Sequence, residues 1–422
     1  MPPGTGRHVA IIGAGAIGVI SAIEAVRDGH RVTLIESAEP GGTQAASYGN
    51  AGWLGSHSVI PPAGPGLWKA VPGLLMDPLG PLAIRWAHLP KAMPWLARYL
   101  WSGWTRAKVE ETARALRLLL NDAPVLHKVL AEEAGLSGLI QCQGLLHVYP
   151  SRAGFEAEKL AWEIRHHVGV RWIELEDQDL RRREPDLDPR YCCGVLVEEG
   201  GHCRDPGAYV GGLARHAQAL GAQVVAAKAE GFDIRGGRLR SVVTDRGEVA
   251  CDAAVIAAGI HSKALCASLG DRLPLATERG YHVVIEGAEV GPRCAMMADR
   301  IGVSWMRGGL RAAGQVEIAA VDAAPDWRRA DILRDGLTAL FPALAPNIRK
   351  ADVRLWMGHR PSMPDGRPCI GRSRATPDIV YAFGHGHVGL AGSARTGRLV
   401  AQLLSGRETE IPLAPFDPRR YL

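Results

Sequence analysis

The stretch from residue 8 to residue 36, "HVAIIGAGAIGVISAIEAVRDGHRVTLIE", decides the fold. Residues 8–12 show the pattern of a short buried strand, residues 19–27 that of a helix, and residues 31–36 that of a second strand ending in an acid. Three glycines separate the first strand from the helix with the spacing G-x-G-x-x-G. The complete order of strand, glycine loop, helix, strand and acid predicts a βαβ unit that binds a dinucleotide.

The glycines of this stretch have separate physical roles. Gly13 permits a tight turn, Gly15 lets a pyrophosphate approach the backbone, and Gly18 lets the helix pack closely on the strand. Backbone N–H groups at Ala16 and Ile17, at the start of the helix, are free to bind phosphate. The loop is therefore predicted to hold the pyrophosphate of the dinucleotide.

The acid that ends the second strand, Glu36, discriminates among dinucleotides. Its carboxylate can accept hydrogen bonds from ribose hydroxyls, whereas it would repel the 2′-phosphate of NADP. The motif alone does not separate FAD from NAD, so this choice depends on the rest of the chain.

Composition and charge exclude several classes of protein. The 422 residues carry a formal net charge of +5, which is too small to indicate nucleic-acid binding. The eight cysteines include no C-x-x-C pair, so we expect reduced thiols, without a disulfide framework or a bound metal. No run of about twenty apolar residues predicts a membrane-spanning helix. Glycines interrupt the apolar run near the N-terminus, which argues against a signal peptide and for a cytoplasmic location.

A second glycine cluster, "GHGHVGLAG", occupies residues 384–392. A strand pattern at residues 378–383 precedes it, and a helix is predicted from about residue 389 to residue 404. Glycine is costly to order because it loses the most backbone freedom. Its concentration here indicates that the backbone approaches a ligand closely.

The middle of the chain alternates between helices and strand hairpins. Residues 109–134 predict one long helix, and residues 233–244 a hairpin around Gly-Gly. Residues 254–259 predict a buried strand that ends in small residues, and residues 301–320 a further hairpin. No internal repeat or low-complexity tract is present.

Taken in this order, the motifs resemble those of the D-amino-acid oxidase superfamily of FAD enzymes. The resemblance covers nearly the whole chain and includes "GHRPSMPDGRPCIG" at residues 358–371. The segments "SYGNAGW", "DPLGPLAIRW" and "GHGHVGLAG" are most similar to bacterial D-amino-acid dehydrogenases and their D-hydroxyproline-oxidising relatives. An NAD-binding domain needs no returning glycine loop near its C-terminal end, so the resemblance favours FAD, bound without a covalent link.

The resemblance implies an α/β fold with an α+β substrate part. A Rossmann-like FAD-binding domain is interleaved with a substrate domain built on an antiparallel sheet. We expect residues 1–66, 190–272 and 342–422 in the FAD-binding domain. Residues 67–189 and 273–341 are expected to form the substrate-binding domain.

The resemblance also implies which residues surround the cofactor. In this family the late glycine loop packs against the isoalloxazine ring, and the helix that follows directs its positive end towards the reduced flavin. Together with the dinucleotide motif, it predicts cofactor contacts at Gly13, Gly15, Ala16, Ile17, Gly18, Glu36, Ser37, Ser47, Gly49, Asn50, Ala51, Gly52, Val225, Ala257, Ala258, Gly259, Gly358, Arg360, Gly384, His385, His387, Val388, Gly389 and Leu390.

Three residues are candidates for the chemistry. Arg360 matches the family arginine that clamps the substrate carboxylate, because a guanidinium fork suits a carboxylate; the alternative is an ordinary structural ion pair. Strand alternation directs either Tyr281 or His282 towards the flavin, and we favour Tyr281. His57 follows the small-residue loop and is either a pocket residue or a core or surface histidine.

The predicted reaction is hydride transfer from the α-carbon of a D-amino acid to flavin N5, including cyclic substrates such as D-proline or D-hydroxyproline. Electrons would then pass to a quinone or a protein acceptor. Three alternatives stay open: an oxidase that uses O₂, an enzyme of the sarcosine- or glycine-oxidising type, and a non-catalytic FAD-binding subunit. The second type often holds FAD through a cysteine, and Cys369 is not where that link is expected.

Residues 67–108 have an unusual composition. They hold five of the eleven tryptophans, and their six basic residues accompany one acid, Asp77. The segment is either a set of short core helices or a peripheral patch that docks on an anionic membrane surface at the inner face of the cytoplasmic membrane. In the second case the basic contacts would be Lys69, Arg85, Lys91, Arg98 and Lys108.

Overall fold

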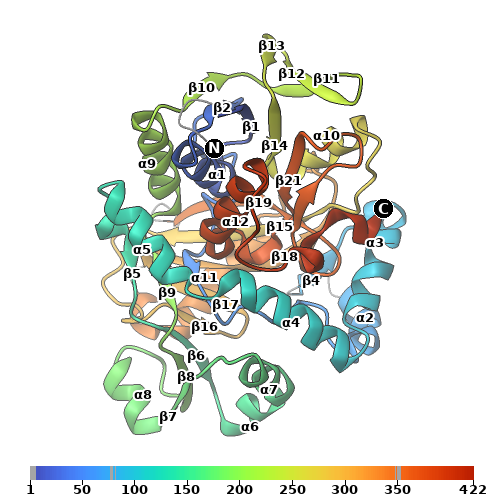
Figure 1. Ribbon diagram of the computed structural model, residues 1–422. Helices are drawn as coiled ribbons and strands as arrows, with labels where there is room; N and C mark the ends of the chain where they lie inside the picture. Colours follow the sequence, from blue (N-terminus) through green and yellow to red (C-terminus); the bar gives the residue numbers. More distant parts are fainter. Residues whose placement is uncertain (1–5, 77–78, 81, 347, 349–352) are drawn as a thin grey trace.

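A computed structural model describes residues 6–76, 79–80, 82–346, 348 and 353–422. Two large sheets organise this part of the chain (Figure 1). A mainly parallel six-stranded sheet carries the dinucleotide motif, and a nine-stranded sheet lies against the carboxyl ends of its strands. The predicted α/β fold with an antiparallel substrate part is confirmed.

The six-stranded sheet has the order β10-β2-β1-β14-β21-β20, parallel except for β20. Strands β2, β1, β14 and β21 are buried along most of their length, as the interior of a parallel sheet requires, whereas the edge strand β10 is partly exposed. Three helices cover one face, and a three-stranded antiparallel sheet covers the other. These elements are β1 (His8–Ile12), β2 (Arg31–Glu36), β10 (Gln223–Ala226), β14 (Ala253–Ile256), β20 (Cys369–Arg372) and β21 (Ile379–Phe383), the helices α1 (Ala16–Arg27), α9 (Pro206–Ala219) and α12 (Gly389–Leu404), and the covering strands β11 (Ala229–Arg235), β12 (Arg238–Thr244) and β13 (Gly247–Ala250).

The nine-stranded sheet has the order β19-β15-β18-β17-β16-β6-β8-β7, with β4 paired to β18 off this path. We call it the roof sheet, because one of its faces covers the loops that follow β2 and β21. The opposite face packs on helix α11 (Arg328–Leu340). The strands are β4 (Leu82–Ile84), β6 (Leu145–Tyr149), β7 (Ile173–Glu176), β8 (Cys193–Val197), β15 (Ala276–Ile285), β16 (Met296–Ala298), β17 (Ile301–Met306), β18 (Gly309–Ile318) and β19 (Val353–Ser362).

The remaining elements connect or support the two sheets. A small antiparallel sheet joins β3 (Trp53–Leu54), β9 (Gly201–Cys203) and β5 (Ile140–Gln141). The other helices are α2 (Leu67–Met76), α3 (Leu89–Ser102), α4 (Arg106–Leu120), α5 (Ala123–Glu133), α6 (Arg152–Ala157), α7 (Lys159–His167), α8 (Asp177–Arg183) and α10 (Ser262–Ser268).

The sheets divide the chain at other points than those predicted. Strand β19 falls in the predicted FAD-binding range 342–422, and β8 falls in the range 190–272, yet both belong to the roof sheet. The reason is pairing: β19 bonds to β15 in unbroken register over its whole length. Helices α4 and α5, from the predicted substrate part, pack instead on α12. The single helix predicted at residues 109–134 is wrong, because Asp122 adopts a left-handed φ of 60° between α4 and α5.

The tryptophan-rich segment forms short helices around β4 at one edge of the molecule (Figure 1). Helix α3 buries Ala92, Trp95 and Tyr99 against the roof sheet and leaves Met93 and Trp101 exposed. Asp77 lies outside the described residues. Among the described helices, none is both long and apolar enough to cross a membrane.

Candidate active site

The dinucleotide loop has room for its backbone only because it contains glycine. Gly13 has a φ of +101°, and a Cβ there would lie 2.6 Å from the Ala257 carbonyl oxygen. A Cβ at Gly18 would overlap the Gly13 carbonyl oxygen. At Gly15 the space is open, since the nearest atom to an added Cβ is the Ser47 hydroxyl oxygen at 3.8 Å. The first and third glycines thus serve packing, and the second faces free space.

The first turn of helix α1 presents backbone N–H donors that could bind an anion. Gly15 caps the helix without a side chain, so the first N–H groups have no side-chain partner. The buried hydroxyl of Ser47 lies beside this helix start and also has no hydrogen-bond partner among the described residues. Free N–H donors together with an unpartnered hydroxyl fit a pyrophosphate that both would bind.

Glu36 is fixed at the carboxyl end of β2. One carboxylate oxygen accepts the Ala14 N–H at 2.8 Å, and the other accepts the Ser37 hydroxyl at 3.3 Å and the Ala38 N–H at 3.2 Å. Val225 lies beside this point, because β10 pairs with β2 through Val225 and Ile35. This geometry fixes the carboxylate at the end of β2, beside the dinucleotide loop.

Hydrogen bonds from the roof sheet hold the loop that follows β2. His282 Nδ1 donates to the Gly49 carbonyl at 3.1 Å, and Arg311 donates to the carbonyl of Asn50 at 2.6 Å. The Ser304 hydroxyl donates to the Ala51 carbonyl at 2.8 Å. These bonds fix the loop beneath the roof sheet and link the two large sheets.

Trp356 is a site residue that the sequence did not predict. Its indole covers Gly49 and Gly358, where an added Cβ would overlap the ring, and it stacks on His282 at 5.1 Å. Gly52 completes the loop with a φ of +79°. Glycine at these positions lets the loop, the strand and the indole approach one another.

The late glycine loop reaches the same face of the roof sheet. Gly384 and Gly386 have φ values of +83° and +53°, and His385 forms a β-bridge with Ser362 of β19. The ring of His385 turns inward and bonds to the Thr396 hydroxyl at 3.0 Å. Burial lowers the pKa of His385 to about 3, so this histidine is a neutral structural group of the loop. Helix α12 begins at Gly389, immediately after it.

Arg360 projects from β19 on the face that covers these loops. Its NH1 group donates to the Gln315 carbonyl at 3.2 Å, and within the described residues it forms no ion pair with a carboxylate. A Cβ at Gly280, on the neighbouring strand, would overlap the guanidinium group. Gln315 occupies a β-bulge of β18 with a φ of +59°, which directs its carbonyl to the arginine. Burial lowers the pKa of Arg360, although Glu278 opposes this effect.

The expectation that Tyr281 faces the flavin is wrong. Cross-strand pairing places Glu278, Gly280 and His282 on the face of Arg360, and Tyr281 on the opposite one. The Tyr281 hydroxyl donates to Glu317 at 2.6 Å and accepts the Asp326 N–H at 3.0 Å, in the core between the roof sheet and α11. The predicted alternation of side chains along the strand is correct, but only the pairing with β19 decides which set of side chains lies on the face of Arg360.

His57 lies in a different part of the molecule from Arg360. Its Nε2 shares a hydrogen bond of 3.0 Å with Nε2 of His147 on β6, and both rings are buried near Trp53 and Trp162. Five strand spacings separate β6 from β19, or roughly 24 Å at about 4.8 Å each. The prediction that His57 shares a pocket with Arg360 is therefore not supported by its position.

A carboxylate–imidazole pair at the site was only half predicted. Nε2 of His387, in the late glycine loop, lies 3.2 Å from a carboxylate oxygen of Glu278, which also accepts the Ser362 hydroxyl. Glu278 was not a candidate, because only the pairing of β15 with β19 puts it opposite Arg360. The one sequence signal that could have identified it is its position two residues before Gly280 in "ERGYH", since strand alternation places residues two apart on the same face.

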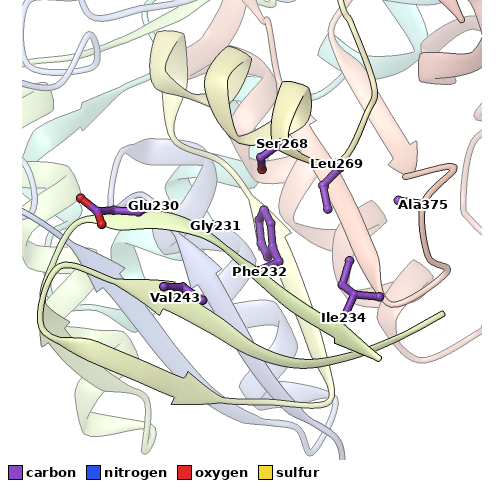
Figure 2. Close-up of a pocket in the computed structure, with 8 residues that line it drawn as sticks. All are labelled: Glu230, Gly231, Phe232, Ile234, Val243, Ser268, Leu269 and Ala375. Atoms are coloured by element: carbon purple, nitrogen blue, oxygen red, sulfur yellow. The ribbon is translucent and has the colours of Figure 1, made fainter. Parts of the chain in front are cut away.

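One pocket of the fold lies away from this site, between β11 and the end of α10 (Figure 2). Its volume is about 510 Å³. Its lining is mostly apolar, with Phe232, Ile234 and Leu269 extending the core of the six-stranded sheet. It contains none of the glycine-loop or roof-sheet residues above. Across the described ranges, no three His, Cys, Asp or Glu side chains gather as metal ligands would.

The fold and the site together define a flavin-dependent oxidoreductase. It has a dinucleotide-binding loop, two further glycine-containing loops after β2 and β21, and a mainly antiparallel roof sheet that carries Arg360. The chain belongs to the DAO family of FAD-dependent oxidoreductases, whose model matches residues 8–403. FAD is its cofactor, and the open Gly15, the uncapped α1 and the unpartnered Ser47 hydroxyl fit its pyrophosphate.

Two curated relatives and one solved structure illustrate the similarity. The chain is 66% identical to a D-amino-acid oxidase of Bradyrhizobium diazoefficiens over 419 residues, covering 99% of each chain. It is 30% identical to a D-amino acid dehydrogenase of Rhizobium johnstonii, covering 98% of this chain and 99% of the relative. Glycine oxidase from Geobacillus kaustophilus superposes with a TM-score of 0.73 at 22% identity, covering 99% of each chain, which shows a shared fold.

Proposed function

We propose that this chain oxidises the α-carbon of a D-amino acid with non-covalently bound FAD. The observation that carries the proposal is Arg360, a cation on the roof face above the cofactor loops that forms no ion pair with a carboxylate among the described residues. Glu278 acts on it through electrostatic attraction only, and a guanidinium largely removed from water is costly until a hydrogen-bonded counter-charge completes the pair. The substrate carboxylate supplies that counter-charge. Two relatives whose names include D-amino acids support the choice of substrate class.

The residues of the chain then have defined tasks. Arg360 anchors the carboxylate through its fork, and Gly280 leaves the space that the guanidinium needs. The bonds from His282 and Ser304 fix the loop below, so that substrate and cofactor meet in one geometry. When bound, the flavin accepts the hydride from the α-carbon.

For the electron acceptor, we propose a quinone reached at a membrane surface. The support is the exposure of the tryptophan-rich segment, in which Trp68, Trp86, Trp101 and Trp104 are each about half exposed or more. Lys108 lies 3.5 Å from the centre of the Trp101 ring. Arg85 does not contribute, because it is engaged with Glu317 at 2.6 Å. The basic groups left for an anionic headgroup surface are Lys69, Lys91, Arg98 and Lys108.

Molecular oxygen is the second candidate acceptor. The observation that favours it is the 66% identity to a protein named D-amino-acid oxidase. The same site residues serve both acceptors, because the substrate oxidation is identical and only the later removal of electrons differs.

The test has two stages. Anaerobic mixing of the purified flavoprotein with single D- and L-amino acids, including D-proline and D-hydroxyproline, should bleach the flavin only with D-isomers. A flavin that stays oxidised with every D-amino acid would refute the substrate class. Reoxidation by O₂ is then compared with reoxidation by a soluble quinone, with and without anionic vesicles. Acid precipitation should release the flavin into the supernatant, and colour retained in the pellet would refute non-covalent binding.

A further inference from the structure

A buried carboxylate shares the roof face with the substrate arginine. Glu278 and Arg360 are directly opposite each other in the pairing of β15 and β19, so their side chains leave the sheet on the same side. The Glu278 side chain is 5% exposed, whereas the His387 side chain that it binds is 40% exposed. The late glycine loop thus places a half-open imidazole beside the arginine, with a buried carboxylate behind it.

The hydrogen bond determines which nitrogen of His387 is available. An ionised carboxylate can only accept, so the Nε2–H of His387 donates to Glu278. The neutral ring then carries its lone pair on Nδ1. A carboxylate that orients an imidazole in this way is the arrangement of a general base held by a positioning residue.

Of the titratable groups near His387, Glu278 is the one that carries a negative charge. Burial alone would raise the pKa of Glu278, but the His387 ring, the Ser362 hydroxyl and Arg360 outweigh it and hold the pKa below its usual value. Tyr99 of α3 is neutral, because burial and then Glu278 raise its pKa. Burial keeps His385 neutral in the same loop. The protonated form of His387 therefore has an anionic partner within hydrogen-bond distance.

The proposed oxidation requires a proton acceptor. An amino acid arrives as a zwitterion, and its nitrogen needs a free lone pair before hydride can leave the α-carbon. We propose that His387 Nδ1 accepts the proton of the substrate α-ammonium, with Glu278 as the positioning residue; this inference rests on the proposed function. The substrate N–H bond breaks, the Nδ1–H bond forms, and the electron pair stays on the substrate nitrogen. The half-exposed ring then returns the proton to solvent.

This assignment divides the zwitterion between two groups. Arg360 binds the carboxylate, and the Glu278–His387 pair receives the ammonium end. The site should consequently prefer amino acids over 2-hydroxy acids of the same shape. That preference can be measured by binding alone, with 2-aminoisobutyrate and 2-hydroxyisobutyrate, which lack an α-hydrogen and cannot be oxidised.

The first experiment measures the affinity of both compounds for the holoenzyme from the flavin absorbance change. His387→Gln should weaken 2-aminoisobutyrate at least tenfold and leave 2-hydroxyisobutyrate unchanged, whereas Arg360→Ala should weaken both. His359→Gln is the matched control, because His359 lies on the same strand but on the opposite face, bonded to Thr277. An unchanged amino-over-hydroxy preference in His387→Gln would overturn the inference. Unchanged binding in Arg360→Ala would instead overturn the proposed function.

The second experiment follows anaerobic flavin reduction by D-alanine, or by the fastest D-amino acid of the screen, as a function of substrate concentration. His387→Gln should slow reduction at saturating substrate by about 10²–10⁴-fold at neutral pH, the usual contribution of a general base. Glu278→Gln should lower the same saturating rate without weakening the binding of 2-hydroxyisobutyrate, since the His387 ring loses the carboxylate that orients it, and Glu278→Asp should restore part of the rate. A merely structural Glu278 would change flavin content without changing the rate per bound flavin, and that result would overturn its role. Rates are referred to bound flavin, and His387→Asn serves if the glutamine variant loses FAD.

Discussion

Gly280→Ala should disable Arg360 without unfolding the protein. The added Cβ would overlap the guanidinium carbon and both terminal nitrogens of Arg360. Carbon–carbon contact needs about 3.5 Å, so the end of this flexible side chain must move by roughly an ångström. The backbone of β15 is already extended at Gly280 and accepts alanine. The clash is thus relieved at the arginine rather than in the fold.

The expected effect on catalysis follows from the lost fork. A charge-assisted hydrogen-bonded pair contributes about 1.5–3 kcal/mol, so kcat/KM for the D-amino acid should fall by roughly 10- to 150-fold. The midpoint of denaturant unfolding should change little. Gly231→Ala is the matched control, because a Cβ at this strand glycine meets no atom within 4 Å.

The assay is a double-mutant cycle with Arg360→Ala, which alone should cost about 2–4 kcal/mol. In the Arg360→Ala background, Gly280→Ala should have almost no further effect, because the group it displaces is absent. Additive losses in the double variant would refute the assignment of Gly280 as the space for the guanidinium. A large loss of unfolding free energy in the single variant would refute the claim that the side chain moves rather than the sheet.

Other perturbations test the dinucleotide loop, the Arg360 guanidinium, the buried histidines and the tryptophan-rich segment. Gly18→Ala should abolish FAD binding and lower stability, since its Cβ would overlap the backbone at Gly13; retention of stoichiometric flavin would contradict this. Arg360→Lys should recover only part of the Arg360→Ala loss in kcat/KM, because an ammonium cannot form the fork. Burial lowers the pKa of His147 to about 3, below its value in the unfolded chain. This group alone should therefore lower the free energy of unfolding by about 1.4 kcal/mol per pH unit as the pH falls from about 6.5 towards 3. His147→Gln should remove this contribution to the pH dependence of thermal unfolding. Sedimentation with anionic vesicles should be reduced by high salt and by Trp101→Ser; protein that stays in the supernatant at low salt would remove the membrane argument.

The dinucleotide unit could be predicted from the sequence because its determinants are local. The turn at Gly13, the contact at Gly18 and the acid at Glu36 all lie within one βαβ unit, where spacing alone specifies the geometry. The late glycine loop could also be predicted from local sequence, because its unusual glycine content indicates a backbone that other groups approach closely. Arg360 was identified through its place in a recognisable segment.

The tertiary structure decided what depended on pairing between distant segments. Alternation along residues 276–285 predicts two faces, but only the register with β19 shows that Glu278 and Gly280 share the face of Arg360, and Tyr281 does not. The same pairing moves β19 out of the predicted FAD-binding range, and His57 lies far from Arg360 because its partner His147 is on β6, five strands along the roof sheet from β19. A period of two residues determines which side chains share a face, whereas hydrogen bonds to a strand remote in sequence determine what that face meets.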